Sequence, residues 1–229
     1  MLCVEKSQYE LCIEVLRRLH RAGVLENAMI IASWCIPFHR EYFAETSYAP
    51  SIKTRDIDFL IPLPAKFRRS TDIPNLLKDL GFIMGFKGPA GYIMLEHPSL
   101  IVEFLVPEKG KGLDKPYPLP QLGVNAQTLR FLKFLTQSKI NIEVEGIPVI
   151  MPHPANFALH KLLILERRTT SDKLQKDVDA AKKILKALVE IGDSASIRGV
   201  FESAPKRWQK KMMRGLREIG EENLLGILR

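Results

Sequence analysis

The amino-acid sequence predicts an α/β fold of the α+β kind, in which an α/β region extends to about residue 152 and a helical region follows. Two patterns lead to this prediction. Short apolar runs bounded by glycine or proline alternate with amphipathic stretches before residue 152, and the apolar spacing after residue 155 is helical throughout. The chain has 229 residues, of which 46% are hydrophobic and 26% charged. This composition excludes a collagenous or broadly disordered protein.

The first part of the chain begins with an amphipathic pattern. Leu11, Val15 and Leu19 recur at helical spacing, and arginines occupy the other side of the same stretch. In order, we expect a helix over residues 9–21, a strand over 28–32, a second helix with Ser33 as its N-cap, a strand over 54–61, and a helix over 73–80 that Gly81 ends in the left-handed conformation.

The middle of the chain predicts strands and turns. We expect strands over residues 91–96 and 100–106, a loop over 108–120, a helix over 127–136, and a hairpin or strand pair over 141–150 with Glu145-Gly146 at its turn. Helices are then expected over residues 157–168 and 172–190, with two shorter ones after Gly192 and Pro205. The chain is thus predicted to form an α/β domain over residues 1–152 and a helical domain over residues 153–229.

The charge balance and the cysteines narrow the class of protein. Lys and Arg number 34 against 26 Asp and Glu, and the resulting net charge of +8 favours polyanionic partners or phosphorylated substrates. Cys3, Cys12 and Cys35 lack C-x-x-C spacing, so reduced thiols are expected rather than disulfides or a zinc site. No stretch resembles a signal peptide or a transmembrane segment, which predicts a cytoplasmic protein without membrane contact.

Three acidic residues are candidates for chemistry. Asp56 and Asp58 are two residues apart on a predicted strand, so their side chains leave the same face, and Ile57 and Phe59 point into the core. Glu103 interrupts an apolar strand and needs a partner. One interpretation is a salt bridge to Arg55 or Lys53, or a strand end in water. The other is a third carboxylate that completes a site for two Mg²⁺ ions.

The order of these elements resembles the nucleotidyltransferase fold shared by minimal nucleotidyltransferases, aminoglycoside nucleotidyltransferases and AbiEii-type toxins. The resemblance is carried by the turn Ala32-Ser33 after a strand, by Asp56-Ile57-Asp58, and by Ile101-Val102-Glu103-Phe104. It implies a small mixed sheet flanked by helices, an NTP substrate, and Mg²⁺ held by Asp56, Asp58 and Glu103 as catalytic residues. Ser33 would contact phosphate. The first glycine of the family's turn is Ala32 here, which would crowd the approach of a phosphate.

A second part of the resemblance lies in the helical region. His160-Lys161-Leu162-Leu163, then Arg167-Arg168, then Lys176-Asp177-Val178-Asp179 are similar to a Lys, Arg and Lys-Asp-x-x-Asp run of AbiEii-like proteins. This implies nucleotide binding by Lys161, Arg168 and Asp177. Lys161 and Arg168 are expected on one helix face, and of Asp177 and Asp179 one is expected to be only a surface charge.

Two functions remain open from the sequence. The first is a Mg²⁺-dependent nucleotidyltransferase that moves an NMP from an NTP to a hydroxyl of RNA, a protein or a small molecule; the resemblance adds a toxin-like role and an antitoxin partner. The second is a catalytically inactive protein of the same fold that binds RNA through its basic surface. Residues 206–217 contain six Lys or Arg and no acid, so a helix there would be strongly cationic on one side.

Overall fold

A computed structural model describes residues 2–44, 46–50, 54–108, 115–218, 220 and 222–228, with the side chains of residues 2–7 excepted. The chain divides into two compact units. Unit 1 comprises Met1–Phe38, Ser51–Lys133 and Ile140–Met151. Unit 2 comprises His39–Pro50, Phe134–Lys139 and Pro152–Arg229.

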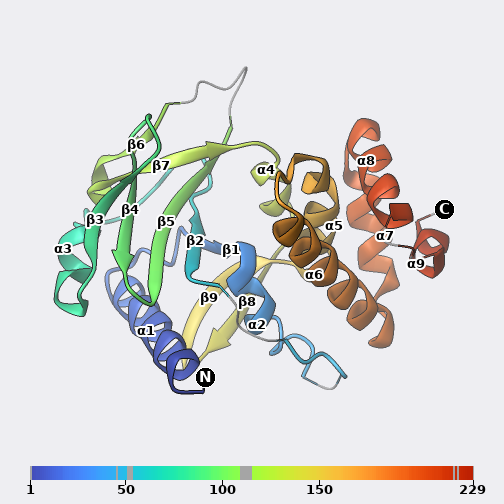
Figure 1. The fold of residues 1–229 in the computed structure, drawn as a ribbon, viewed down its shortest axis with the longest axis horizontal. Coiled ribbons are helices and arrows are strands. Elements are labelled where there is room, and N and C mark those ends of the chain that lie inside the picture. The colour runs from blue at the N-terminus through green and yellow to red at the C-terminus, as the bar shows by residue number, and fades with distance from the viewer. Residues whose placement is uncertain are drawn as a thin grey trace. The chain divides into compact units, whose positions relative to one another are not determined.

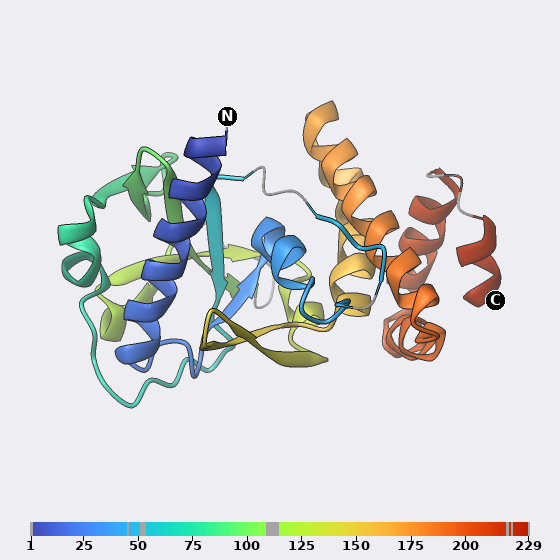
Figure 2. The same ribbon diagram turned by 90° about the horizontal axis from the view of Figure 1, so that it is seen from below.

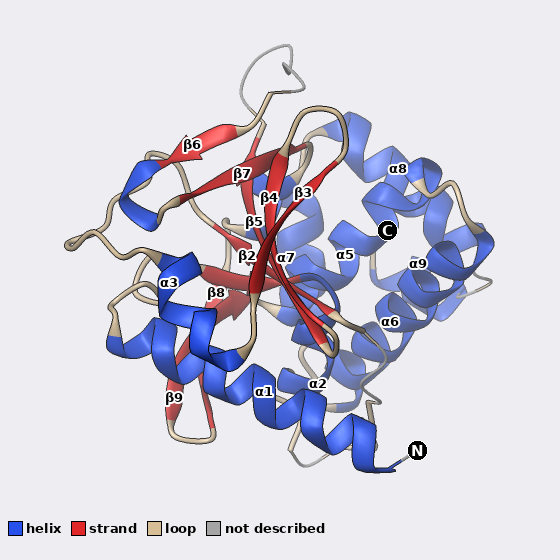
Figure 3. Ribbon diagram, turned by 60° about the vertical axis from the view of Figure 1, so that its left-hand side comes forward, coloured by secondary structure: helices blue, strands red, loops and turns tan. Residues whose placement is uncertain are grey.

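Unit 1 is built on a mixed sheet, shown in red in Figure 3. Its strands are β1 (Met29–Ile31), β2 (Asp56–Leu60), β3 (Ile83–Lys87), β4 (Tyr92–His97), β5 (Leu100–Pro107), β6 (Tyr117–Leu119), β7 (Val124–Leu129), β8 (Lys139–Val144) and β9 (Ile147–Pro152). The main path runs β3-β4-β5-β2-β1-β9-β8, and β7 pairs with both β5 and β6 (Figure 1). Strand β2 is parallel to β5 and antiparallel to β1. The predicted α/β class with a mixed sheet is confirmed.

The main helix of unit 1 is α1 (Leu2–Arg21), which lies across the sheet (Figure 2). The others are short: η1 (Ala32–Trp34), α2 (Cys35–Phe38), α3 (Ile73–Leu77), η2 (Lys78–Leu80) and η3 (Pro120–Leu122). Helix α4 (Leu132–Leu135) begins in unit 1, and its last two residues belong to unit 2. The apolar residues of α1, including Val15, Leu16 and Leu19, are fully buried, as the amphipathic pattern predicts. Gln8 donates to the carbonyls of Thr54 and Ser99. These bonds fix α1 to the chain just before β2 and just before β5.

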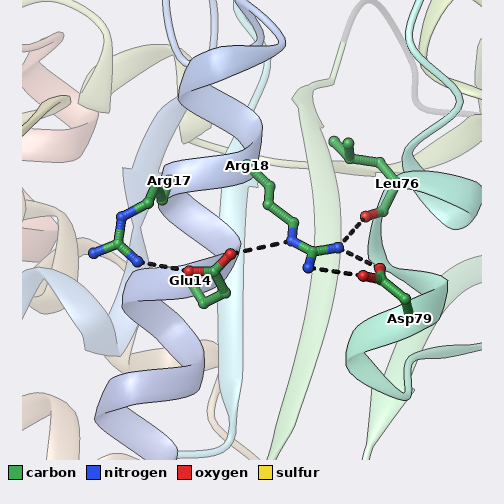
Figure 4. Close-up of polar contacts among 5 residues, drawn as sticks. All are labelled: Glu14, Arg17, Arg18, Leu76 and Asp79. Atoms are coloured by element: carbon green, nitrogen blue, oxygen red, sulfur yellow. Dashed lines mark hydrogen bonds and ion pairs between the residues drawn. The ribbon is translucent and has the colours of Figure 1, made fainter.

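Arg18 holds the other end of α1 to the turn that contains α3 and η2 (Figure 4). Its guanidinium donates to the Leu76 carbonyl at 2.9 Å and to both carboxylate oxygens of Asp79. Glu14, one turn earlier on α1, accepts from Arg18 and from Arg17. Such a fork of planar donors fixes geometry more firmly than a single ion pair.

Unit 2 is helical, with α5 (Pro154–Ile164), η4 (Leu165–Arg167), α6 (Ser171–Glu190), α7 (Ser194–Ser203), α8 (Lys206–Glu218) and α9 (Glu222–Ile227). His39 joins this unit's core: its Nε2–H donates to the Pro152 carbonyl at 3.2 Å, and its ring meets Phe157 edge-on. Burial lowers the pKa of His39 to about 4, although the bond to Pro152 favours protonation. The neutral ring is therefore part of the packing at neutral pH.

Most predicted elements are confirmed, and the turns agree with their residue types. Gly81 has φ 88° and ends η2. The hairpin of β8 and β9 turns at Glu145 and Gly146, both with positive φ, as a two-residue turn of the I′ type requires. Cys12 and Cys35 are buried free thiols, while the side chain of Cys3 lies outside the described part.

Two predictions are wrong, and one strand was not predicted. The helix over residues 127–136 is wrong in its first half, because residues 127–129 of β7 pair with β5 and only Leu132–Leu135 is helical. The loop over 108–120 contains β6, and residues 109–114 lie outside the described residues. Strand β3 was not predicted. In each case strand pairing outweighs the local pattern: β3 pairs with β4, β6 with β7, and β7 also with β5.

No helix within the described ranges is both long enough and apolar enough to cross a membrane.

Candidate active site

Two neighbouring parallel strands bring the predicted acids together. In the register of β2 and β5, Asp58 lies beside Glu103 and Asp56 beside Ile101. Because side chains alternate along a strand, Asp56, Asp58 and Glu103 share one face of the sheet. Ile57 and Phe59, on the opposite face, are fully buried. The expectation that Glu103 lies on a strand adjacent to the Asp pair is confirmed.

The three acids of this sheet face, which we call the acid face, differ in how much of each is exposed. Asp56 is exposed, Asp58 is half-buried, and the Glu103 side chain is only 13% exposed. Of the two cations proposed for Glu103 from the sequence, Arg55 donates to the His97 carbonyl, and Lys53 lies outside the described residues. A carboxylate as enclosed as Glu103 needs charge compensation.

Lys87 supplies that compensation, and sequence reasoning missed it. Its Nζ, at the end of β3, donates to both oxygens of Glu103 at 2.8 and 3.1 Å. Partial burial disfavours the charged ammonium, but the bond to Glu103 and the charges of Glu103, Asp58 and Asp56 outweigh it and raise the pKa of Lys87. The signal that identifies β3 is the apolar run Ile83-Met84-Gly85-Phe86 between two turn glycines.

The donor set suits a divalent cation in type and register, since Mg²⁺ prefers carboxylate oxygens and Asp56 and Asp58 offer them from one face. The side chains as placed do not form a closed site. Over the described ranges, no group of three or more His, Cys, Asp or Glu converges as metal ligands would. Glu103 is bonded to Lys87 instead. Asp56 and Asp58 are therefore the residues that would hold a cation.

The turn after β1 lies next to the acids, because Ile31 at the end of β1 is the register partner of Asp58. Ala32 follows with φ 58°, a left-handed conformation that glycine adopts more easily than alanine. The predicted N-cap role of Ser33 is wrong: Ser33 lies inside η1, whose N-cap is Ile31, without a side-chain cap bond. The backbone thus keeps the conformation of a glycine turn without the glycine.

In unit 2, the three predicted nucleotide-binding residues form a buried cluster. Asp177 on α6 accepts from Lys161 Nζ at 2.5 Å and from Arg168 Nε. Lys161 and Asp177 side chains are each 6% exposed, whereas Arg168 is 30% exposed. The expectation that Lys161 and Arg168 share a helix face is wrong, because α5 ends at Ile164 and Arg168 is extended. Their side chains meet through Asp177 instead.

Asp179, Phe157 and His160 lie near this cluster in the sequence or in space. Asp179 is exposed and accepts from Gln175, so it is the surface charge of the Asp pair. Lys161 Nζ also lies 5.2 Å from the centre of the Phe157 ring, a favourable cation–π contact. His160 is buried beside Lys161, and burial lowers its pKa to about 3.

Comparisons with known proteins bear on the family and the fold of the chain. The family model described as a nucleotidyltransferase matches residues 10–204. An antigenic nucleotidyltransferase-like protein from Paracoccidioides brasiliensis has a similar structure over 96% of this chain and 92% of its own, at 13% identity and a TM-score of 0.50, which concerns the fold alone. ANT(2″)-Ia in complex with adenylyl-2″-tobramycin aligns over 93% of this chain and 98% of its own, at 11% identity and a TM-score of 0.48. The comparison with curated proteins finds no match.

Proposed function

The chain belongs to the nucleotidyltransferase family, whose model matches it over residues 10–204, and from this premise we propose that it transfers an NMP from an NTP to an acceptor hydroxyl with the aid of Mg²⁺. The observation that carries the proposal is the strand register that sets Asp58 beside Glu103, with Asp56 on the same face. Three carboxylates on one sheet face, next to the turn that follows β1, are a suitable binding site for an NTP with its divalent cation.

Each residue of this face has a proposed role. Asp56 and Asp58 hold the cation, which when bound neutralises phosphate charge and favours ionisation of the acceptor hydroxyl. The acceptor oxygen forms a bond to the α-phosphorus, the bond to pyrophosphate breaks, and the hydroxyl proton passes to a carboxylate of this face. Ser33, half-buried in the turn after β1, offers its amide and hydroxyl to phosphate oxygens.

Of the three residues in unit 2 that the sequence suggested for nucleotide binding, we propose that one contacts the nucleotide. Lys161 is enclosed and bonded to Asp177, so its main role is to hold that carboxylate. Arg168 is the most exposed of the three and is proposed as the one that contacts a nucleotide phosphate.

The test is transfer of label from each of the four α-³²P-labelled NTPs, with Mg²⁺, to RNA and to protein of a cell lysate. We expect label in one acceptor class, and a loss of at least 100-fold in the Asp56→Asn/Asp58→Asn variant. Asp179→Asn, an exposed change on α6, is the control and should transfer normally. Equal labelling by the double variant and the unchanged protein would refute the proposal.

A second candidate, RNA binding without catalysis, is favoured by the surface of α8. A hollow of about 510 Å³ in unit 2 is lined by the cations Lys206, Lys210, Arg214 and Arg217 and by apolar side chains that include Phe201 and Met213. Such a surface attracts phosphates, and apolar contacts favour bases. This function predicts RNA affinity that falls steeply with salt, persists in EDTA and is lost in Lys210→Glu/Arg217→Glu. Binding that ignores salt would exclude it.

A further inference from the structure

Strand β3, at one end of the main path of the sheet, carries exposed apolar side chains on its outer edge (Figure 1). Ile83 is 68% exposed, Met84 44% and Phe86 65%. Within the described ranges, the other exposed large apolar side chains lie on α6 and at its C-terminal cap; they are Leu174, Val189 and Ile191. Half of the exposed large apolar side chains in this part of the chain are therefore on one strand.

Strand β8, at the other end of the path, is protected as edge strands usually are. Its exposed residues are polar and alternate with less exposed apolar ones; they are Lys139, Asn141 and Glu143. Polar and charged side chains on an edge discourage pairing with another strand. The charged residue of β3, Lys87, instead extends inward to Glu103. Strand β3 thus has the surface of a strand that pairs with a further one.

The backbone groups that a further strand needs point outward at Met84 and Phe86. On β4, the Ile93 N–H donates to Asn125 Oδ1 of β7, so it points away from β3. Backbone direction alternates along an antiparallel pair, and residues opposite each other share it. Phe86, which is opposite Ile93, and Met84, two residues earlier, therefore direct their N–H and C=O groups away from β4.

Charge selects how a second copy would pair with this edge. A Cβ at Gly85 would lie 1.9 Å from Glu96 Oε1, so the Glu96 carboxylate lies over Gly85. An antiparallel copy with Gly85 opposite Gly85 would set two such carboxylates against each other. With Phe86 opposite Phe86, Lys87 of each copy is opposite Gly85 of the other, so a cation lies beside each Glu96.

We propose that β3 is an interface between two copies of this chain, paired antiparallel with Phe86 opposite Phe86. The two aromatic rings then contact each other across the strands, and the outward backbone groups of β3 are bonded. The acid faces of both copies lie on the same side of one continuous sheet. Because a single strand edge is a small interface, the dimer is weak and depends on concentration. The inference does not depend on the proposed function.

The first test is sedimentation equilibrium of the full chain from about 1 µM to about 1 mM, which covers weak to moderate association. The unchanged protein is expected to dimerise reversibly. Phe86→Lys should raise the dissociation constant by about ten-fold or more, because it replaces an aromatic pair by two like charges. Leu174→Lys, which changes an exposed apolar residue on α6, is the matched control and should dimerise normally.

The second test is disulfide formation between copies in a Cys3→Ser background, in which Cys12 and Cys35 are retained because they are buried. Phe86→Cys should form the disulfide, since the Cα atoms of this opposed pair are about 5.5 Å apart. Met84→Cys should not, because in this register the two Met84 positions are offset along the strands by about 13 Å.

The outcomes that would overturn the proposal are distinct. A chain that stays monomeric over the whole range, or a dimer that Phe86→Lys leaves unchanged, would remove β3 as the interface. Loss of the dimer in a folded Leu174→Lys variant would assign the interface to α6 instead. Disulfide formation as fast in Met84→Cys as in Phe86→Cys would overturn the register. The unchanged chain and the cysteine variants keep the proposal testable if Phe86→Lys does not fold.

Discussion

Replacing Asp177 by Asn tests the reasoning about the buried cluster of unit 2. Asp177 is the shared acceptor for Lys161 and Arg168, and the side chains of Asp177 and Lys161 are each 6% exposed. Asn preserves the shape but removes the charge, which leaves the Lys161 ammonium enclosed without an anion. Breaking a buried ion pair in this way costs about 3–5 kcal/mol of unfolding free energy. Arg168 is 30% exposed and regains water, so it adds little to this figure.

The assay is urea unfolding of the full chain. The sequence has two tryptophans, Trp34 in unit 1 and Trp208 in unit 2. In a Trp34→Phe background the fluorescence of Trp208 therefore reports the unfolding of unit 2. Both the reference protein and the variants carry this change, so its own effect cancels in the comparison.

Two further variants sharpen the result. Asp179→Asn changes an exposed acid on the same helix and should alter the free energy by no more than about 0.5 kcal/mol. Lys161→Met/Asp177→Leu removes the buried pair together and should cost less than Asp177→Asn alone, because apolar replacements of a buried ion pair leave no orphaned charge. A loss below about 1 kcal/mol in Asp177→Asn, with an unchanged denaturant slope, would refute the reasoning.

Three other changes follow from the structure. Ala32→Gly should leave the unfolding free energy unchanged or raise it by up to about 1 kcal/mol, since relief of the positive φ of Ala32 offsets the greater chain entropy of glycine. A fall in the unfolding free energy of more than about 1 kcal/mol would contradict the left-handed conformation of this residue. The depressed pKa values of His39 and His160, about 4 and about 3, mean that both remain neutral in the fold while the unfolded chain protonates near pH 6.5. The contribution of each neutral histidine to the unfolding free energy is therefore fully present above pH 6.5 and is lost as the pH drops towards the folded pKa values, by about 2 kcal/mol per histidine at pH 5. Equal urea midpoints at pH 7 and pH 5 would contradict this prediction. Arg18→Met should lower the thermal midpoint more than Arg17→Met, because Arg18 bonds Leu76 of α3 and Asp79 of η2, whereas Arg17 bonds Glu14 of its own helix. Equal midpoints would contradict a role of Arg18 in holding α1 to α3 and η2.

The sequence predicted the elements whose pattern is local and strong. The amphipathic period of α1, the apolar run of β1, and the strands of Asp56, Asp58 and Glu103 all appear where expected. Alternation along a strand also predicted which face carries the acids, because the period of two is a property of extended backbone itself. Turn residues such as Gly81 and Gly146 marked their turns for the same reason, since positive φ is a local requirement.

Elements that depend on strand pairing rather than on a local pattern were predicted less well. Residues 127–129 were expected to begin a helix, but they form the end of β7 and pair with β5. Strand β3 is exposed except at the half-buried Gly85, and it was not predicted although it is an apolar run between two turn glycines; it forms an antiparallel hairpin with β4. The free energy of sheet pairing outweighs the small differences in local propensity, even where the partner is the next strand along the chain.

The candidate site was likewise predicted in part from the sequence and decided in part by the tertiary structure. From the sequence alone came the three carboxylates, their common face and the resemblance to nucleotidyltransferases. Only the tertiary structure decided that Glu103 bonds Lys87 rather than Arg55, and that Lys161 and Arg168 converge on Asp177. The physical reason is that the partner of a charge is set by strand register and helix packing, which bring together residues that no short-range pattern connects.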